Sequence, residues 1–137
     1  MNLKVSFSKF YSVLLVALFF VSFSSTASAQ LTIENASYCN LWVSGAQMNS
    51  NTLAPCDECN LVSLRRVPPS QSIVVPYNPS CGVEVWKQVF YSAAPSGAHV
   101  ASSENPSVSC GGSSGSVDCL GTPIDVTWNS GTSVTLK

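Results

Sequence analysis

The sequence predicts an all-β protein, a small antiparallel β-sandwich stabilised by disulfide bonds. Along most of the chain, apolar and polar residues alternate in short runs rich in β-branched and aromatic side chains, which is typical of half-buried strands. Six cysteines follow an N-terminal segment that has the features of an export signal. An even number of cysteines in a small exported domain indicates a disulfide framework.

The N-terminal segment has the parts of a secretory signal peptide. Two lysines precede an apolar stretch, Phe10–Phe23, and small residues follow at Ala27-Ser28-Ala29. As a helix this stretch would be about 21 Å long, which is short for a bilayer core of about 30 Å. We therefore expect residues 1–29 to be removed, the alternative being an uncleaved anchor. Residues 30–137 are expected to form one secreted domain, extracellular, periplasmic or at the cell surface, with no membrane span.

The expected strands are the alternating runs, which prolines and glycines separate. The last two runs form a predicted hairpin over residues 123–136, in which the loop Asn129-Ser130-Gly131 gives Gly131 a positive φ. About seven such strands indicate an antiparallel sandwich. The runs are Leu31–Glu34, Asn40–Val43, Val62–Leu64, Ile73–Val75, Val83–Tyr91, Ile124–Asn129 and Val134–Leu136.

The six cysteines allow many pairings, and spacing alone does not choose among them. One pair encloses a Gly/Ser-rich loop that would be flexible if it were not tethered. We therefore expect a Cys110–Cys119 bridge, which would stabilise the fold by about 2–4 kcal/mol. The other four would tie the first strands, the Pro55–Asn60 loop and the region of Cys81 together: Cys39, Cys56, Cys59 and Cys81.

The segment Cys56-Asp57-Glu58-Cys59 has the C-x-x-C spacing of redox and zinc sites. A redox pair is expected at the start of a helix, whereas a proline precedes this motif, a strand-like run follows it, and its two acidic residues disfavour a thiolate. A zinc site would need a second closely spaced pair, which Cys110 and Cys119 do not provide. We expect structural disulfides here, with no metal and no cofactor.

Two patterns bear on a hydrolase function. Gly111-Gly112-Ser113-Ser114-Gly115 matches the G-x-S-x-G of serine hydrolases, but no apolar strand precedes it and no helix follows it. The only histidine, His99, lies in a predicted edge strand. The seven acidic residues show no recognisable catalytic context, although their spacing alone leaves a carboxylate-based glycoside hydrolase open. We predict no catalytic residue.

The charge of the expected domain limits its partners. Of the six basic residues, Lys4 and Lys9 lie in the leader, so four remain against seven acidic residues, a net charge of −3. Without a basic stripe, nucleic acid is disfavoured as a partner. The chain carries few charges, 9% of its residues, which suits neutral partners such as glycans.

Three tryptophans lie in the expected strands. Trp128 alternates in phase with the apolar Ile124 and Val126 and is expected to face the core. Trp86 and Trp42 alternate out of phase with their aliphatic neighbours and are expected to face outward, where an exposed indole among polar side chains can stack on a sugar ring. These two are our candidate binding residues, the alternative being that they cover a second small core.

The segment Asn35-Ala36-Ser37 matches the sequon for N-glycosylation. Such a sequon indicates a surface loop in a secreted protein if it is used. It matters only in a eukaryotic host, and composition does not identify the host.

The start of the expected domain, Leu31–Val43, resembles the first hairpin of thaumatin-like proteins, in which I-x-N followed by Tyr and V-W opens a disulfide-rich β-sandwich. Val67–Val75 is similar to the proline-then-strand segment that follows in that family, and Val85-Trp86 stands at its tryptophan strand. The resemblance covers residues 31–86. It implies a reduced sandwich of the defence or wall-interaction type. It does not imply a glucanase, because the acidic cleft comes from a later domain for which this chain has no room.

Together these observations predict a secreted binding or interaction protein, monomeric or weakly associating. The expected partner is a glycan or a cell-surface protein. The alternatives are a hydrolase acting on polysaccharide or peptidoglycan, and a toxin-like or inhibitor-like defence protein.

Overall fold

The computed structural model describes residues 30–48, 56–82, 85–96 and 99–137. The predicted signal peptide, residues 1–29, lies outside the described residues. Among the residues that are described, no helix is long and apolar enough to cross a membrane.

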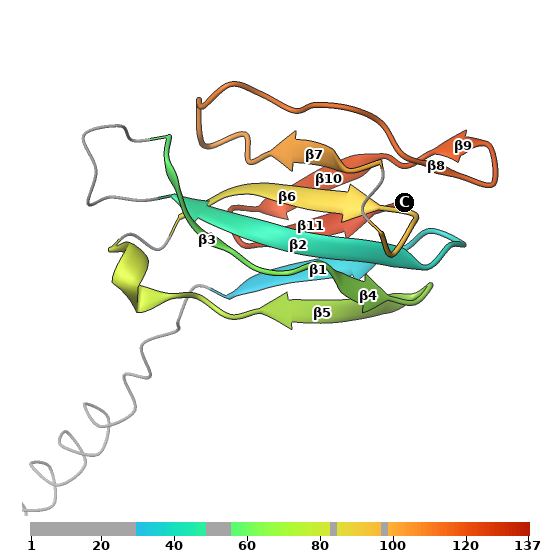
Figure 1. The fold of residues 1–137 in the computed structure, drawn as a ribbon, viewed down its shortest axis with the longest axis horizontal. Helices are drawn as coiled ribbons and strands as arrows, with labels where there is room; N and C mark the ends of the chain where they lie inside the picture. Colours follow the sequence, from blue (N-terminus) through green and yellow to red (C-terminus); the bar gives the residue numbers. More distant parts are fainter. Residues whose placement is uncertain (1–29, 49–55, 83–84, 97–98) are drawn as a thin grey trace, which may run out of the picture.

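The described residues form two facing β-sheets and a small hairpin (Figure 1), which confirms the all-β sandwich. One sheet has the order β10-β11-β1-β5, the other has the order β3-β2-β6-β7 with β4 also paired to β2, and β8 pairs with β9. The elements are β1 (Leu31–Asn35), β2 (Leu41–Met48), β3 (Glu58–Leu61), β4 (Arg65–Val67), β5 (Gln71–Val75), the 3₁₀ turn η1 (Pro79–Cys81), β6 (Trp86–Ser92), β7 (Ala101–Glu104), β8 (Asp118–Cys119), β9 (Thr122–Pro123), β10 (Val126–Ser130) and β11 (Ser133–Leu136).

The strand pairs are antiparallel with one exception. Strands β1 and β11 run parallel, with Ile33 opposite Val134, so the sandwich is not wholly antiparallel as predicted. The predicted C-terminal hairpin is confirmed as β10–β11. Its turn is shorter than expected, because Ser130 pairs with Ser133, and Gly131 does not have a positive φ.

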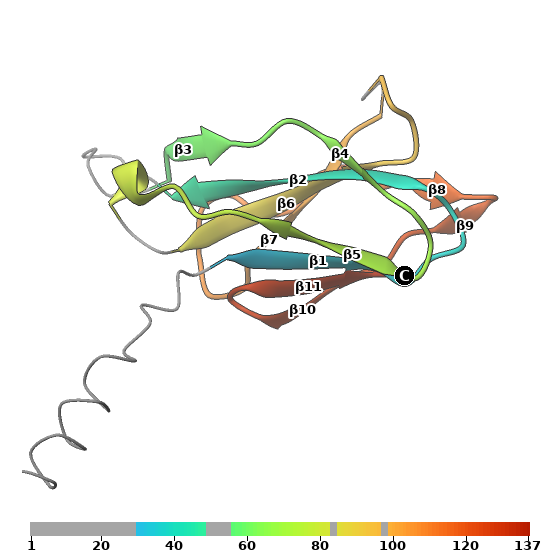
Figure 2. The same cartoon turned by 90° about the horizontal axis from the view of Figure 1, so that it is seen from below.

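The strands that alternate clearly in sequence are those that supply the core. Strands β1, β5 and β11 face β2 and β6 across the sandwich (Figure 2). The largest aliphatic side chains of these strands are fully buried in one core cluster. The expected strand at Val62–Leu64 is instead the break between β3 and β4. Strand β7, with the sequence Ala-Ser-Ser-Glu, shows too little apolar alternation to be predicted. The main aliphatic core residues are Leu31, Ile33, Leu41, Val43, Val67, Val75, Val89, Val134 and Leu136.

The six cysteines form three disulfide bonds, as predicted, and none of them is free. The pairs are Cys39–Cys119, Cys56–Cys110 and Cys59–Cys81. The predicted Cys110–Cys119 bridge is therefore wrong. The segment between β7 and β8 runs along the length of the sandwich (Figure 1), so the two cysteines at its ends are tied to different parts of the fold.

Hydrogen bonds to β7 fix the Gly/Ser-rich segment in place of the predicted Cys110–Cys119 disulfide bond. Ser102 and Ser114 exchange two backbone hydrogen bonds, at 2.8 and 3.1 Å. The carboxylate of Glu104 accepts hydrogen bonds from the backbone N–H groups of Cys110 at 2.6 Å and Gly112 at 2.8 Å. Backbone N–H groups that a carboxylate satisfies in this way fix a loop without any apolar side chain.

Tyr91 on β6 gives the fold a pH dependence in the alkaline range. Burial, and secondarily the negative charge of Asp125, raises the pKa of this phenol above its ordinary value of 10.0. The folded state therefore holds the proton more tightly than the unfolded state. The resulting stability is complete below about pH 10 and is lost as the pH rises through the raised pKa. In urea melts above about pH 10, the free energy of unfolding should fall more in the wild type than in Tyr91→Phe. Coincident pH profiles would assign the alkaline loss to another group.

Candidate functional site

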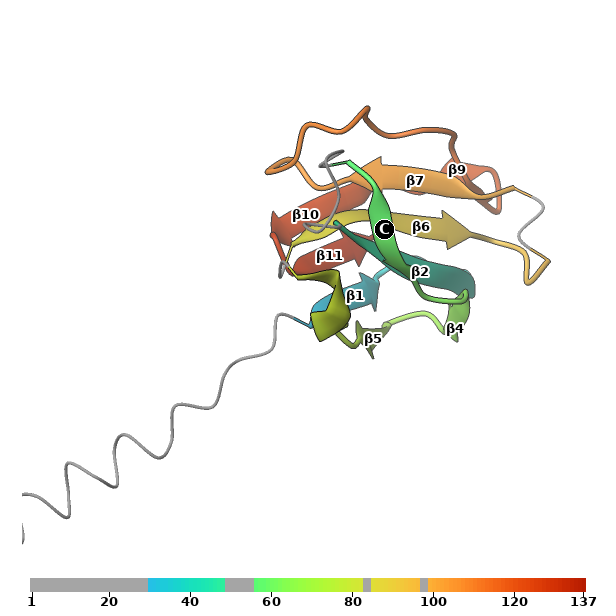
Figure 3. The same cartoon turned by 60° about the vertical axis from the view of Figure 1, so that its left-hand side comes forward.

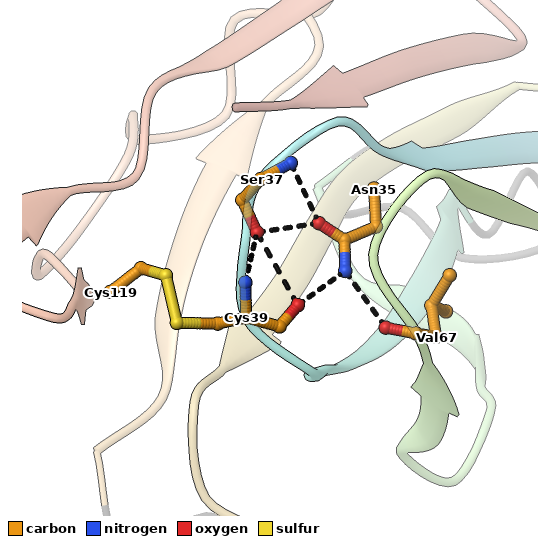
Figure 4. The surroundings of a disulfide bond; sticks show 5 residues. All are labelled: Asn35, Ser37, Cys39, Val67 and Cys119. Carbon is orange, nitrogen blue, oxygen red and sulfur yellow. Dashed lines mark hydrogen bonds between the residues drawn. A yellow bond between two sulfur atoms is a disulfide. The ribbon is translucent and has the colours of Figure 1, made fainter.

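The loop that joins β1 to β2 is built around one buried amide, that of Asn35. Its Nδ2 donates to the carbonyl oxygens of Cys39 at 2.7 Å and of Val67 at 2.8 Å. Its Oδ1 accepts from the N–H of Ser37 at 3.0 Å and from the hydroxyl of Ser37 at 2.6 Å. Asn35 is fully buried and Ser37 nearly so. Because buried polar groups are costly unless they are satisfied, this closed network fixes the loop in one conformation (Figure 4).

A disulfide bond joins this loop to the β8–β9 hairpin. Cys39, at the end of the Asn35 network, is bonded to Cys119 of β8, which lies 80 residues further along the chain (Figure 4). The β1–β2 loop and the hairpin accordingly lie side by side at one end of the sandwich (Figures 1 and 2). Each bridging cysteine is the sequence neighbour of an exposed side chain, Tyr38 in the loop and Leu120 in the hairpin turn.

Tyr38 and Leu120 are far more exposed than other large apolar residues of the described chain. Tyr38 is 91% exposed and Leu120 is 90% exposed, against 46% for Val74 and 41% for Val100. Single exposed apolar residues are ordinary on protein surfaces. Two large ones on neighbouring loops that a disulfide bond joins form a patch. We call the surface formed by Tyr38, Leu120 and the hollow between their loops the tip surface.

The hollow of the tip surface has a volume of about 330 Å³. Of the residues that line it, only Lys137 carries a charged side chain, and most of the others are apolar or small. Such a lining can make contacts and exclude water, and the residues that form it include no histidine, aspartate or glutamate. The lining residues are Ala36, Ser37, Tyr38, Cys119, Leu120, Thr122, Pro123, Ile124 and Lys137.

The prediction that Trp86 lies on an exposed face is wrong, because its side chain is fully buried between the sheets. The register of β2 and β6 shifts at this point: Ala46 pairs with Gln88 but Gln47 pairs with Trp86, so β6 carries one extra residue, Lys87. A β-bulge of this kind moves the side chains beyond it to the opposite face. Trp86 therefore packs in the core and cannot contact a partner.

Trp42 lies on the outer face of its sheet, as the alternation predicted. Its β2 neighbours Leu41 and Val43 are fully buried in the core, whereas Trp42 is half-buried. Across the strands it is paired with Arg66 of β4 and Ser92 of β6. Trp42 therefore stays a candidate contact residue, but it does not share a face with the buried Trp86, and it is not among the residues that line the hollow of the tip surface. Trp128, in contrast, packs against the core with Ile124 and Val126, as predicted.

The sequon at Asn35 is a structural element in the folded protein. Both amide hydrogens of Asn35 are used inside the domain, which leaves none for a glycan. The same arrangement recurs at Asn105, whose Nδ2 donates to the carbonyl of Trp86 at 2.9 Å and whose Oδ1 accepts from the N–H and hydroxyl of Ser107 at 3.0 and 2.7 Å. Two N-x-S segments thus hold their own loops through hydrogen bonds of the asparagine amide. The N-x-S pattern is visible in the sequence, but interpreting it as a glycosylation sequon misses this structural role.

The hydrolase motif does not form a nucleophile site. The hydroxyl of Ser113 accepts a hydrogen bond from the N–H of Glu104 at 3.0 Å. His99 is exposed just before β7, not within a strand. It lines a separate hollow of about 400 Å³ with Ser116 and Asp118, but within the described part of the chain no hydrogen bond or ion pair joins these three side chains.

Two of the acidic residues serve structural roles in the described part of the chain. Glu58 pairs with Lys87 at 3.1 Å and accepts from Gln88 at 2.6 Å, and Glu104 holds the Gly/Ser-rich segment. Glu84 lies outside the described residues. In the described ranges no three His, Cys, Asp or Glu residues could hold a metal ion together.

The C-x-x-C segment is not a dithiol pair. Cys56 and Cys59 belong to two different bridges, one to Cys110 and one to Cys81. Cys59 thereby ties β3, at the edge of one sheet, to η1, which follows β5 at the edge of the other. Figure 3 shows η1 beside the edge strands. The structural-disulfide interpretation of both cysteines is confirmed.

Tyr38 and Leu120 were not among the predicted site residues. Their sequence signal is weak, since each is one apolar residue next to a cysteine. The Cys39–Cys119 pairing holds their loops together at one end, and spacing does not reveal that pairing.

Comparison with known proteins returned no matching family model, no matching curated protein and no matching solved structure. The resemblance of residues 31–86 to thaumatin-like proteins therefore stays a prediction.

Proposed function

We propose that this protein is a secreted interaction module that binds a protein partner through the tip surface. The observation that carries the proposal is the exposure of Tyr38 and Leu120, 91% and 90%, on two loops that a disulfide bond and a buried hydrogen-bond network hold in place. Exposed apolar side chains on rigid loops lose little conformational entropy on binding, which favours affinity.

The chemistry of the tip surface favours a protein over a glycan. Sugar sites combine an aromatic platform with several polar or charged groups, whereas Lys137 is the one charged residue that lines this hollow. An exposed leucine has neither a hydrogen-bonding group nor an aromatic face for a sugar, but it can fill an apolar pocket on a protein. An aromatic and an aliphatic anchor side by side are typical of the centre of a protein interface.

The disulfide bonds support secretion. Three bridges and no free cysteine indicate folding in an oxidising compartment. The predicted signal peptide, residues 1–29, supports the same destination. The domain is therefore expected to meet its partner outside the cytoplasm.

A photo-crosslinking experiment tests the proposal. A photoreactive phenylalanine analogue replaces Tyr38 in one preparation and Val74, an exposed residue on the edge strand β5, in a matched control. After illumination with an envelope and culture-medium extract of the source organism, we expect one identifiable protein to be linked from position 38 and not from position 74. Leu120→Asn should abolish the link. Equal labelling from both positions, or no dependence on Leu120, would contradict the proposal.

A second candidate function rests on Trp42. Its half-buried indole lies beside the exposed Arg66 of the neighbouring strand, so an aromatic surface and a hydrogen-bonding guanidinium could together receive a sugar ring. On a glycan array, this function predicts binding by the wild type that Trp42→Ala removes and that Leu120→Asn leaves intact. Loss of glycan binding in both variants, or in neither, would reject Trp42 as a sugar site.

A further inference from the structure

Arg66 of β4 is a cation without an anionic partner in the described part of the chain. The one ion pair among these residues joins Lys87 to Glu58, so no described carboxylate lies within ion-pair distance of Arg66. Arg66 is exposed, and the Oδ1 of Asn40 accepts hydrogen bonds from its Nε at 3.1 Å and its Nη2 at 2.9 Å. These contacts use two of the five N–H groups of a guanidinium, and the other three can donate to an anion from solution.

The segments that carry Arg66 and Asn40 are fixed to each other by the buried amide of Asn35 (Figure 4). Asn40 follows Cys39, whose carbonyl oxygen accepts a hydrogen bond from this amide at 2.7 Å. Arg66 precedes Val67, whose carbonyl oxygen accepts from the same amide at 2.8 Å. The guanidinium is therefore held on a rigid support, and a side chain that is already ordered loses less conformational entropy when it binds.

Trp42 of β2 lies directly beside Arg66. The two residues are partners in the antiparallel β2–β4 pair, so their side chains leave the same face of the sheet with Cβ atoms about 4.5–5.5 Å apart. Phe90 of β6 is the partner of Ser44, which lies on the same face of β2 as Trp42. Both aromatic side chains are half-buried. An aromatic surface that extends over two strands thus ends at a fixed guanidinium.

This combination favours a sugar that carries a carboxylate. The C–H face of a pyranose ring packs on an aromatic ring, and a carboxylate accepts two parallel hydrogen bonds from a guanidinium. A neutral sugar would leave the charge of Arg66 without a counter-charge. An acidic peptide would pair with that charge but would make no use of the flat aromatic surface beside it.

We infer that this outer face binds an acidic glycan, with a uronic acid ring on Trp42 and the carboxylate of that ring on Arg66. The inference rests on the second candidate function, the sugar site at Trp42, and names its substrate class. Because the expected domain has a net charge of −3, the preference for an acidic ligand comes from this one contact and not from the charge of the whole protein.

A panel of uronic acid oligomers tests the inference. Oligomers of galacturonate, glucuronate, mannuronate and guluronate are each compared with their methyl esters, which keep the rings and remove the charge. In titration calorimetry at low ionic strength, the wild type should bind at least one acidic oligomer about tenfold more tightly than its ester, as expected for a charge-assisted hydrogen bond. Added salt should reduce this preference, because the contact is exposed.

Two arginine variants separate contact from net charge. Arg66→Gln should weaken binding of the acidic oligomer about tenfold and binding of the ester much less, so the preference disappears. Arg65→Gln is the matched control, because it changes the net charge equally, but the side chain of Arg65 donates to the carbonyl oxygen of Val74 on β5 instead. This control should keep the preference. Trp42→Ala should weaken the binding of acids and esters alike.

Equal affinity of the wild type for every acid and its ester would overturn the inference, as would an equal loss of preference in Arg65→Gln and Arg66→Gln. If urea melts show that Arg66→Gln does not fold, Arg66→Lys takes its place. Lysine keeps the charge but lacks the planar fork, so the preference should fall several-fold. An unchanged preference in this variant would overturn the inference.

The second candidate function has its own outcomes. Binding of acids and esters alike that Trp42→Ala removes would leave the sugar site intact, and only its selectivity for acids would be wrong. Binding that Trp42→Ala leaves intact would reject the sugar site itself. Binding of no oligomer would overturn the inference, and the glycan array would then decide whether Trp42 receives a neutral sugar.

Discussion

Replacing Trp86 with alanine should lower the free energy of unfolding by about 3–5 kcal/mol, as is usual for a large aromatic side chain removed from a core. Trp86 is fully buried, and Gly45 makes room for it: a Cβ on Gly45 would lie 3.0 Å from Trp86 Cζ3 and 2.7 Å from Leu31 Cδ2. The indole thus fills the space between the sheets where β2 has no side chain. Its removal leaves a cavity, and the disulfide-bonded strands cannot move together to fill it.

Urea denaturation at neutral pH measures this effect, with Trp42→Ala as the matched control. Trp42 is also a strand tryptophan, but it is half-buried on the outer face, so its loss should cost much less than that of Trp86. A cost under about 1 kcal/mol for Trp86→Ala would place the residue on the surface and contradict the register shift in β6.

Removing the Cys39–Cys119 bridge as a Cys39→Ser, Cys119→Ser double variant should lower the free energy of unfolding by about 2–5 kcal/mol. The bridge closes a long loop, because its two cysteines have a sequence separation of 80, so it restricts the unfolded chain strongly. In the chain-entropy account such a loop corresponds to about 4.5 kcal/mol. The same variant should weaken every interaction of the tip surface, because Tyr38 and Leu120 lose their common support.

The Cys59→Ser, Cys81→Ser double variant is the control for that experiment. Its bridge spans only 22 residues, and the chain-entropy account then gives about 3.4 kcal/mol. Denaturant melts should therefore show a smaller loss than for Cys39–Cys119, and crosslinking from position 38 should persist at temperatures where the control stays folded. Crosslinking that survives loss of the Cys39–Cys119 bridge would show that the bridge does not position the tip surface.

The sequence predicted those parts of the fold that depend on local alternation. The apolar faces of Leu31–Asn35 and Leu41–Val43, and the inward side of Trp128, follow from period two, because burial on one face of a strand selects every second residue. The oxidised state of the cysteines followed from their number and the predicted export. Strand β7 escaped prediction because its place in the sheet comes from backbone pairing with β6, which any side chain permits.

The candidate site could not be predicted in the same way because it depends on contacts between distant residues. One extra residue in β6 reverses the face of Trp86, and no local pattern marks a bulge. The partners of Cys39 and Cys110 depend on the path of the segment after β7, which its Gly/Ser composition does not define. Leu120 is notable only for its exposure, which is a property of the folded chain alone.

The parallel pair of β1 and β11 has a consequence for the order in which the domain can fold. Glu34 of β1 and Thr135 of β11 are hydrogen-bonded although 101 residues separate them, and β11 lies between β1 and β10 in the sheet. A chain that emerges from a translocation channel N-terminus first would present β1 long before its neighbour. Until the last strand emerges, β1 has only β5 beside it, and the sheet stays incomplete. Contacts of such long range fold slowly. Completion of this sheet therefore waits for the last strand of the chain, whereas all six cysteines precede that strand.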